Sequence, residues 1–197
     1  MRTRFVLLAL LALVVSACAG PRDHTGRAVE AATGTTAAAG ATVASNAQAK
    51  FPPPGLVPAA RRQPAPALRV TAFDGRTVTL EGMRGRPVVV SFFESWCSTC
   101  QEEQPDLTRV AREFAGRVGF VGVSYHDTVA AGRDYQRRFA VSYPLANDAS
   151  GRTWSRWRVP YQPVTVLVDK QGRVAERFDG GTTGGTLRAA LAYLVDE

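Results

Sequence analysis

Two cysteines, Cys97 and Cys100, are separated by two residues and directly follow the apolar run 88–93. Such a pair can close a small disulfide ring or hold a metal ion. A closed zinc site needs four ligands, and the chain adds only Cys18, far upstream, and two histidines at no recognisable ligand spacing. Redox chemistry is therefore favoured over metal binding, and we expect a redox-active disulfide with no metal and no other cofactor.

The residues after Cys97 predict a helix over 98–114, with apolar side chains at helical spacing. The Cys97 sulfur would then lie beside the unpaired N–H groups of the first turn, which favour a thiolate. We expect Cys97 to be the partly exposed nucleophile, and Cys100, one turn further, to be the buried resolving thiol. Exchange would proceed through a mixed disulfide on Cys97. An inert structural disulfide is the alternative.

Two residues inside this helix bear on the chemistry. Glu103 lies three positions beyond Cys100, on the same helix face, and its carboxylate could exchange a proton with that thiol; a solvated glutamate is the alternative. Pro105 predicts a kink, because it cannot donate a backbone hydrogen bond.

A further candidate is Gln162-Pro163, directly before an apolar strand. A proline in this position can adopt the cis form, which is rare and usually has a role. The Gln162 backbone would then turn outwards and pair with an extended substrate peptide. An ordinary loop proline is the alternative.

Residues 68–197 alternate between strand-like and helix-like segments, which predicts one α/β domain with a mixed central sheet flanked by helices. Strands are expected at 68–73, 77–80, 87–93, 118–124, 164–169 and 173–178, and helices at 98–114, 129–139, 152–157 and 185–195.

The amino terminus predicts export. Residues 1–17 combine two arginines, an apolar stretch and small residues, as a secretory signal does, and are too short for a membrane span. Cys18 is placed like the lipidated cysteine of a bacterial lipobox; an ordinary signal-peptidase site is the alternative. Residues 18–67 are mostly Ala, Gly, Thr and Pro, which predicts a disordered, lipid-anchored linker. We expect the domain outside the cytoplasm, anchored to the membrane, where disulfides persist.

The formal net charge is +7 at pH 7, and a basic protein can bind nucleic acid. The basic residues are almost all scattered arginines, and an exported protein rarely meets nucleic acid, so we expect no such partner.

Together these residues resemble the thioredoxin superfamily, and within it the exported TlpA/ResA/DsbE-like group. The resemblance covers 68–197 and is carried by the segments 92–100, 159–163 and 166–172, with Glu103 and Pro105. It implies a thioredoxin-like fold with an added N-terminal β-hairpin. It also implies that Cys97 is the nucleophile, Cys100 the resolver, Glu103 an acid near the buried cysteine and Pro163 a cis-proline beside the disulfide, with Trp96, Gln162 and Pro163 contacting substrate.

Two positions depart from that pattern. Ser91 stands where thioredoxins carry a buried aspartate, so that proton relay is missing. Glu94 replaces a small residue and adds a charge near the active face, where an anion would oppose the Cys97 thiolate.

The resemblance implies thiol-disulfide exchange with exported cysteine-containing proteins and a membrane redox partner that resets the site. An oxidant that forms disulfides is slightly favoured over a reductant in cytochrome c maturation. The alternative of a copper- or haem-handling module would use both cysteines as ligands, with His126 as the candidate third ligand. A peroxidase loop would need a proline at position 90, which is Val90.

Overall fold

The computed structural model describes residues 52–197. The predicted signal segment 1–17, the lipidation candidate Cys18 and the linker as far as residue 51 lie outside the described residues. Within the described part, no helix has the length and apolar character needed to cross a membrane.

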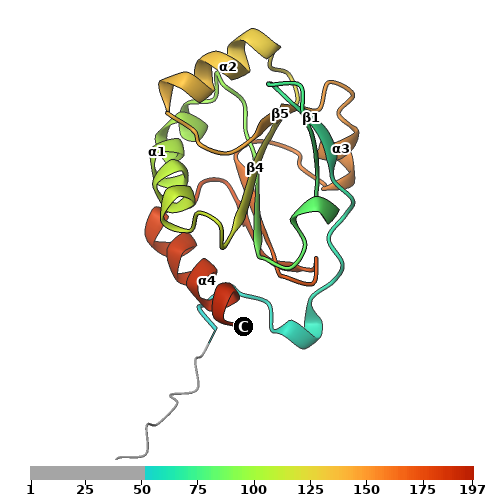
Figure 1. Ribbon diagram of the computed structural model, residues 1–197, viewed down its shortest axis with the longest axis vertical. Coiled ribbons are helices and arrows are strands. Elements are labelled where there is room, and N and C mark those ends of the chain that lie inside the picture. Colours follow the sequence, from blue (N-terminus) through green and yellow to red (C-terminus); the bar gives the residue numbers. More distant parts are fainter. Residues whose placement is uncertain (1–51) are drawn as a thin grey trace, which may run out of the picture. The chain divides into compact units, whose positions relative to one another are not determined.

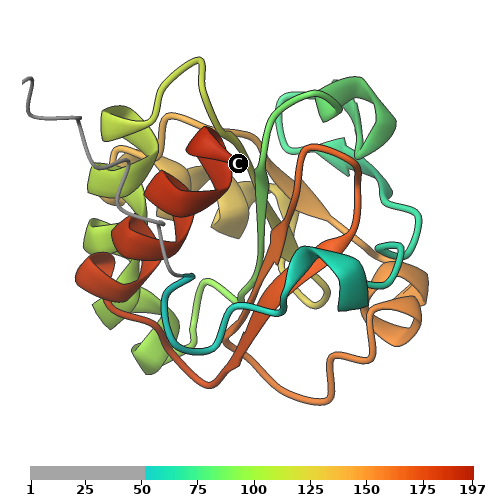
Figure 2. The same cartoon turned by 90° about the horizontal axis from the view of Figure 1, so that it is seen from below.

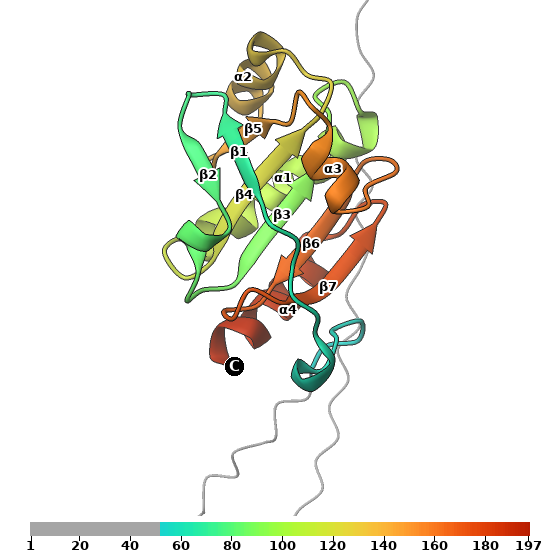
Figure 3. The same ribbon diagram turned by 90° about the vertical axis from the view of Figure 1, so that its right-hand side faces the viewer.

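One mixed sheet of seven strands forms the centre of the domain, in the order β2-β1-β5-β4-β3-β6-β7 (Figure 3). The strands are β1 (Arg69–Ala72), β2 (Thr77–Thr79), β3 (Val88–Phe92), β4 (Gly119–Ser124), β5 (Leu145–Asn147), β6 (Val164–Val168) and β7 (Val174–Asp179). The strands β3, β4 and β5 run parallel, and the remaining pairings are antiparallel. The central strands β3, β4 and β6 are buried along their whole length, as their continuous apolar sequences predict.

Between residues 52 and 197, four α-helices and two short 3₁₀ segments flank the sheet (Figure 1). They are η1 (Ala59–Arg61), η2 (Glu81–Met83), α1 (Ser98–Glu113), α2 (Val129–Arg138), α3 (Arg152–Arg156) and α4 (Gly184–Asp196). Figure 2 shows α1 and α4 together on one side of the sheet and α3 on the other. The thioredoxin-like α/β fold is confirmed, including the added hairpin of β1 and β2.

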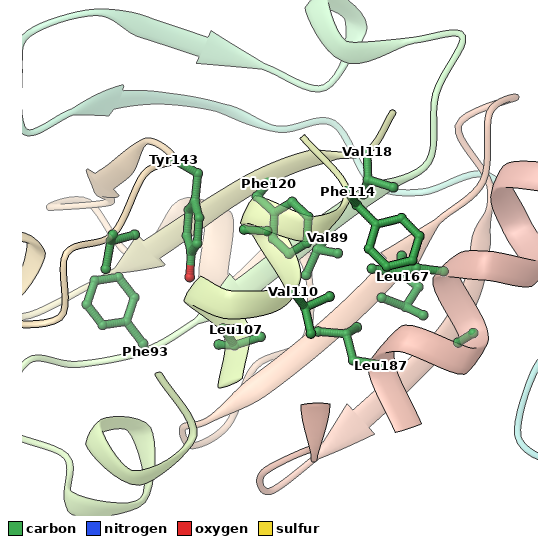
Figure 4. Close-up of a cluster of buried hydrophobic side chains, with 14 of the residues drawn as sticks. Val89, Phe93, Leu107, Val110, Phe114, Val118, Phe120, Tyr143, Leu167 and Leu187 are labelled. Carbon is green, nitrogen blue, oxygen red and sulfur yellow. The ribbon is translucent and has the colours of Figure 1, made fainter. Parts of the chain in front are cut away.

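The two faces of the sheet bury separate apolar clusters, because side chains alternate along each strand. The cluster under α1 and α4 is shown in Figure 4, where the labelled residues are Val89, Phe93, Leu107, Val110, Phe114, Val118, Phe120, Tyr143, Leu167 and Leu187. On the other face, the ring of Phe92 meets Trp154 of α3 edge-on at 5.8 Å. These clusters fix the end of β3, and with it the start of α1.

A glycine in α2 allows close packing against the hairpin. A Cβ at Gly132 would come within 2.1 Å of Cζ of Phe73, so only a residue without a side chain fits there. The next residue reinforces the contact, since Arg133 donates from Nε to the Phe73 carbonyl at 2.9 Å. The added hairpin is thereby joined to the helical layer.

The prediction that the linker extends to residue 67 is wrong at its C-terminal end. Residues 56–65, here named the strap, lie along the edge strand β7. The Val57 N–H donates to the Ala175 carbonyl at 2.8 Å, and the Val174 N–H donates to the Gln63 carbonyl at 2.8 Å. Leu56 is buried in the cluster under α1 and α4.

An ion-pair network holds the strap in place. Arg62 is buried, and its Nη1 lies 3.2 Å from Oδ2 of the buried Asp169 and 2.6 Å from Oε2 of Glu197. Its Nε donates to the Val57 carbonyl at 2.8 Å. The composition of this segment does not reveal the two ion pairs, because their partners lie more than a hundred positions away.

Candidate active site

The disulfide between Cys97 and Cys100 closes where β3 leads into α1. Cys97 is the N-cap of α1, and its Sγ accepts the Cys100 backbone N–H at 3.1 Å. The sulfur therefore occupies the position at the helix start that the sequence predicts. Cys97 is 8% exposed and Cys100 is 1% exposed, so the first sulfur is the one that a partner can approach.

The predicted cis peptide bond is present between Gln162 and Pro163. Antiparallel pairing of Phe92 with Val164 brings this loop to the same end of the sheet as the disulfide. The side chains of Trp96 and Tyr161 are 63% and 50% exposed, and with Val129 they are the large exposed hydrophobic side chains of the described residues. All three lie in connections between strands at this end of the sheet, so exposed apolar side chains are found at the same end as the disulfide.

Glu103 is buried in the second turn of α1. Its Oε2 accepts the Thr182 backbone N–H at 3.0 Å, whereas Oε1 has no partner among the described residues. Burial disfavours the charged form and raises the pKa of Glu103 to about 7, against the opposing effect of the Thr182 hydrogen bond. The group can therefore bind or release a proton near neutral pH.

A buried polar network lies beneath Cys100. The Tyr135 hydroxyl of α2 donates to the Cys100 carbonyl at 2.9 Å and lies 3.3 Å from Oε1 of Gln104. Gln104 in turn donates to the hydroxyl oxygens of Tyr143 at 2.8 Å and Thr108 at 3.0 Å. Burial raises the pKa of both tyrosines, which keeps them protonated as donors. The sequence offered one signal for this network, the spacing of Gln104 and Thr108 on a buried helix face.

The structure places the Glu94 side chain inside the protein, behind the active face and not on its surface. Its side chain is fully buried and turned towards the loop after β4. Oε2 accepts the Ser124 hydroxyl at 2.9 Å, and Oε1 accepts the backbone N–H groups of Tyr125 and His126, each at 2.9 Å. The ring Nδ1 of His126 lies 3.3 Å from the same Oε1.

Asp127 makes the reciprocal contact from the loop after β4. Its carboxylate accepts the Ser95 N–H at 2.9 Å and the Ser95 hydroxyl at 2.6 Å. Sequence reasoning missed this residue, because nothing in the chain indicates which side chain of one loop will face the other. The parallel pairing of β3 with β4 brings the two loops together.

A metal centre finds no support among residues 52–197, which contain no group of three or more potential ligands that could hold an ion. Nδ1 of His126 lies 3.3 Å from Oε1 of Glu94, and the His126 ring packs against the ring of Tyr125 with 4.0 Å between the centroids.

Comparison with known proteins agrees with this geometry. Residues 62–177 match the AhpC/TSA family. The chain is 25% identical over 128 residues to the thiol-disulfide oxidoreductase ResA of Bacillus cereus, covering 64% of this chain and 74% of that protein. It is 32% identical over 108 residues to the soluble secreted antigen MPT53 of Mycobacterium tuberculosis, covering 55% of this chain and 59% of that protein.

Solved structures give the same result. A secreted thiol-disulfide isomerase from Corynebacterium glutamicum superposes with a TM-score of 0.68 at 25% identity, covering 75% of this chain and 96% of that chain. The dsbF protein of Mycobacterium tuberculosis, solved in mixed oxidised and reduced forms, superposes with a TM-score of 0.60 at 30% identity, covering 64% of this chain and 94% of that chain.

Proposed function

The chain belongs to the AhpC/TSA family and is a thiol-disulfide oxidoreductase, and on this premise we propose that it oxidises pairs of thiols in exported proteins. The observation that carries the direction is the Cys97 sulfur at the start of α1, where it accepts the Cys100 N–H at 3.1 Å. Donors and the helix dipole stabilise a thiolate there. Stabilising the reduced form makes the disulfide a better oxidant.

The reaction runs in two exchanges. A substrate thiolate attacks Sγ of Cys97, the Cys97–Cys100 bond breaks, and Cys100 leaves as a thiolate. Glu103, with its pKa raised to about 7, supplies the proton that Cys100 takes up. A second substrate thiolate then attacks the substrate sulfur of the mixed disulfide and releases Cys97 as a thiolate, so the substrate loses two electrons and the protein gains them.

The substrate segment binds across the exposed end of the sheet. Trp96, 63% exposed beside the nucleophile, offers an apolar surface to residues that flank the substrate cysteine. The backbone of Gln162 and Pro163, on the opposite side of the site, pairs with the extended segment as an added strand. Exported proteins with exposed cysteines fit these contacts better than small thiols do.

We place the protein outside the cytoplasm, attached to the membrane by lipid on Cys18, with a membrane redox partner that reoxidises the dithiol. The sequence of residues 1–18 supports this location. Two relatives, a soluble secreted antigen and a secreted isomerase, support the location outside the cytoplasm.

Two measurements test the proposal. Equilibration with glutathione gives the potential, which we expect between the roughly −270 mV of thioredoxin and the roughly −120 mV of the strong oxidant DsbA. A value near −270 mV would instead favour a reductant. In Cys100→Ala, the Cys97 thiolate should attack disulfides of exported proteins and remain joined to them, because no resolving thiol is left. Cys97→Ala should trap none, because it removes the attacking sulfur.

A further inference from the structure

Two buried carboxylates bracket the segment that leads into the nucleophile. Glu94 extends from this segment into the loop after β4, and Asp127 extends back from that loop to Ser95. Both side chains are almost inaccessible to solvent, at 0% and 5% residue exposure. The pair, here named the carboxylate clamp, joins the two loops by five hydrogen bonds from Ser95, Ser124, Tyr125 and His126.

Glu94 of the clamp lies in the same backbone turn as the reacting Cys97. The Cys97 N–H donates to the Glu94 carbonyl at 3.1 Å. This bond closes a four-residue turn, in which the first and last Cα atoms lie within about 7 Å. A buried charge carried by this turn is screened little by solvent, so it can act on the sulfur at the end of the same turn.

The negative charge of the clamp is not balanced by a permanent cation. Among residues 52–197, neither Glu94 nor Asp127 forms an ion pair with arginine or lysine. The donors are backbone N–H groups and serine hydroxyls, which leave the net charge in place. The one titratable contact is the His126 ring, whose side chain is 60% exposed.

We propose that the carboxylate clamp of Glu94 and Asp127 sets the redox potential of the site, by opposing the Cys97 thiolate that the start of α1 stabilises. This inference rests on the proposed function. When glutathione reduces the protein, the Cys97–Cys100 bond breaks and two glutathione thiols supply two electrons and two protons, forming glutathione disulfide. The clamp shifts this equilibrium towards the protein disulfide, because it disfavours the ionised form of the reduced protein.

The test is Glu94→Gln in the full chain, measured by equilibration with glutathione. An amide keeps an acceptor for the Tyr125 and His126 N–H groups and offers a donor to the Ser124 hydroxyl oxygen, so the clamp keeps its shape and loses its charge. We expect the constant for oxidation of the dithiol by glutathione disulfide to fall about tenfold, which corresponds to a potential about 30 mV higher. The pKa of the Cys97 thiol, followed by thiolate absorbance, should fall by about one unit.

Asp127→Asn is the second variant and should shift both quantities in the same direction. Asp148→Asn is the matched control, since Asp148 is also buried but accepts the N–H groups of Thr153 and Trp154 at the start of α3. The control should lose stability. Its constant with glutathione and the acid dissociation constant of its Cys97 thiol should both stay within twofold of the wild type.

The outcomes separate the two proposals. A wild-type protein that does not equilibrate with glutathione would overturn the proposed function and this inference together. A wild type that equilibrates, with the thiol pKa and the constant unchanged in both clamp variants, would overturn the inference alone. An equal shift in Asp148→Asn would also overturn it, because the effect would then be structural.

Discussion

The surroundings of Glu103 are only partly predictable from its position in the sequence. The spacing from Cys100 predicts a shared helix face, but the unpartnered Oε1 and the contact with Thr182 depend on the loop before α4. Burial at this point raises the pKa of the carboxyl from 4.5 to about 7. The protonated acid is therefore the form that the folded protein favours.

This raised pKa links stability to pH. The unfolded chain releases the Glu103 proton near pH 4.5, whereas the folded protein holds it to about pH 7. The stabilising effect is complete below pH 4.5 and is lost as the pH rises through 7, a difference of about 3 kcal/mol in the free energy of unfolding. In the oxidised protein, Glu103→Gln should remove this part of the pH dependence, as urea unfolding at several pH values will show.

Glu102→Gln provides the control, because Glu102 is the exposed neighbour on the same helix. It should retain the wild-type fall in stability. Parallel curves for the wild type and Glu103→Gln would contradict the assigned pKa.

At the same scale, the cysteines and the cis-proline follow from the sequence, because local spacing determines where they lie. The contacts of Glu94 and Asp127 cannot be predicted from the sequence in this way. Their roles require the pairing of β3 with β4, which brings two loops together that are separated by more than thirty positions.

Helix α2 supports the first turn of α1 through one hydroxyl. Tyr135 donates to the Cys100 carbonyl and also contacts Gln104. Pro105 has no N–H, so the Gln101 carbonyl lacks its usual partner four residues on, next to the carbonyl that Tyr135 contacts. We infer that Tyr135 fixes the turn that carries the resolving cysteine.

Tyr135→Phe should therefore cost about 1–3 kcal/mol, since it leaves buried acceptors without their donor. The free energy of unfolding, from urea denaturation of the oxidised protein, measures this loss. Tyr161→Phe removes an exposed hydroxyl and should stay within about 0.5 kcal/mol of the wild type. Equal losses in both variants would refute a specific role for the Tyr135 bond.

The element order was largely predictable, because buried strands and amphipathic helices carry distinct periodicities. The strand β5 was not predicted. It has three residues, Leu145–Asn147, and no β-branched side chain, so its conformation comes from its neighbours β1 and β4.

At the scale of the whole domain, the strap extends the folded unit beyond the boundary that composition suggests. Arg62 joins the strap to the rest of the domain through Asp169 and Glu197. The Arg62 guanidinium and the Asp169 carboxylate are both buried. Removing Arg62 therefore leaves the buried Asp169 charge only partly paired.

Arg62→Ala should lower the free energy of unfolding by about 3 kcal/mol. Guanidinium chloride denaturation of the oxidised protein gives the value. Arg61→Ala, at the exposed neighbouring position, should change stability by less than about 0.5 kcal/mol. A loss below about 1 kcal/mol for Arg62→Ala would mean that the strap is held mainly by its backbone contacts.

The contact between Gly132 and the ring of Phe73 joins two segments that lie almost sixty positions apart. A methyl group at one position leaves no room for an aromatic ring at the other. Across an alignment of relatives that keep both the hairpin and α2, the two sites should therefore covary: a chain with alanine or serine at the first should carry a smaller side chain at the second.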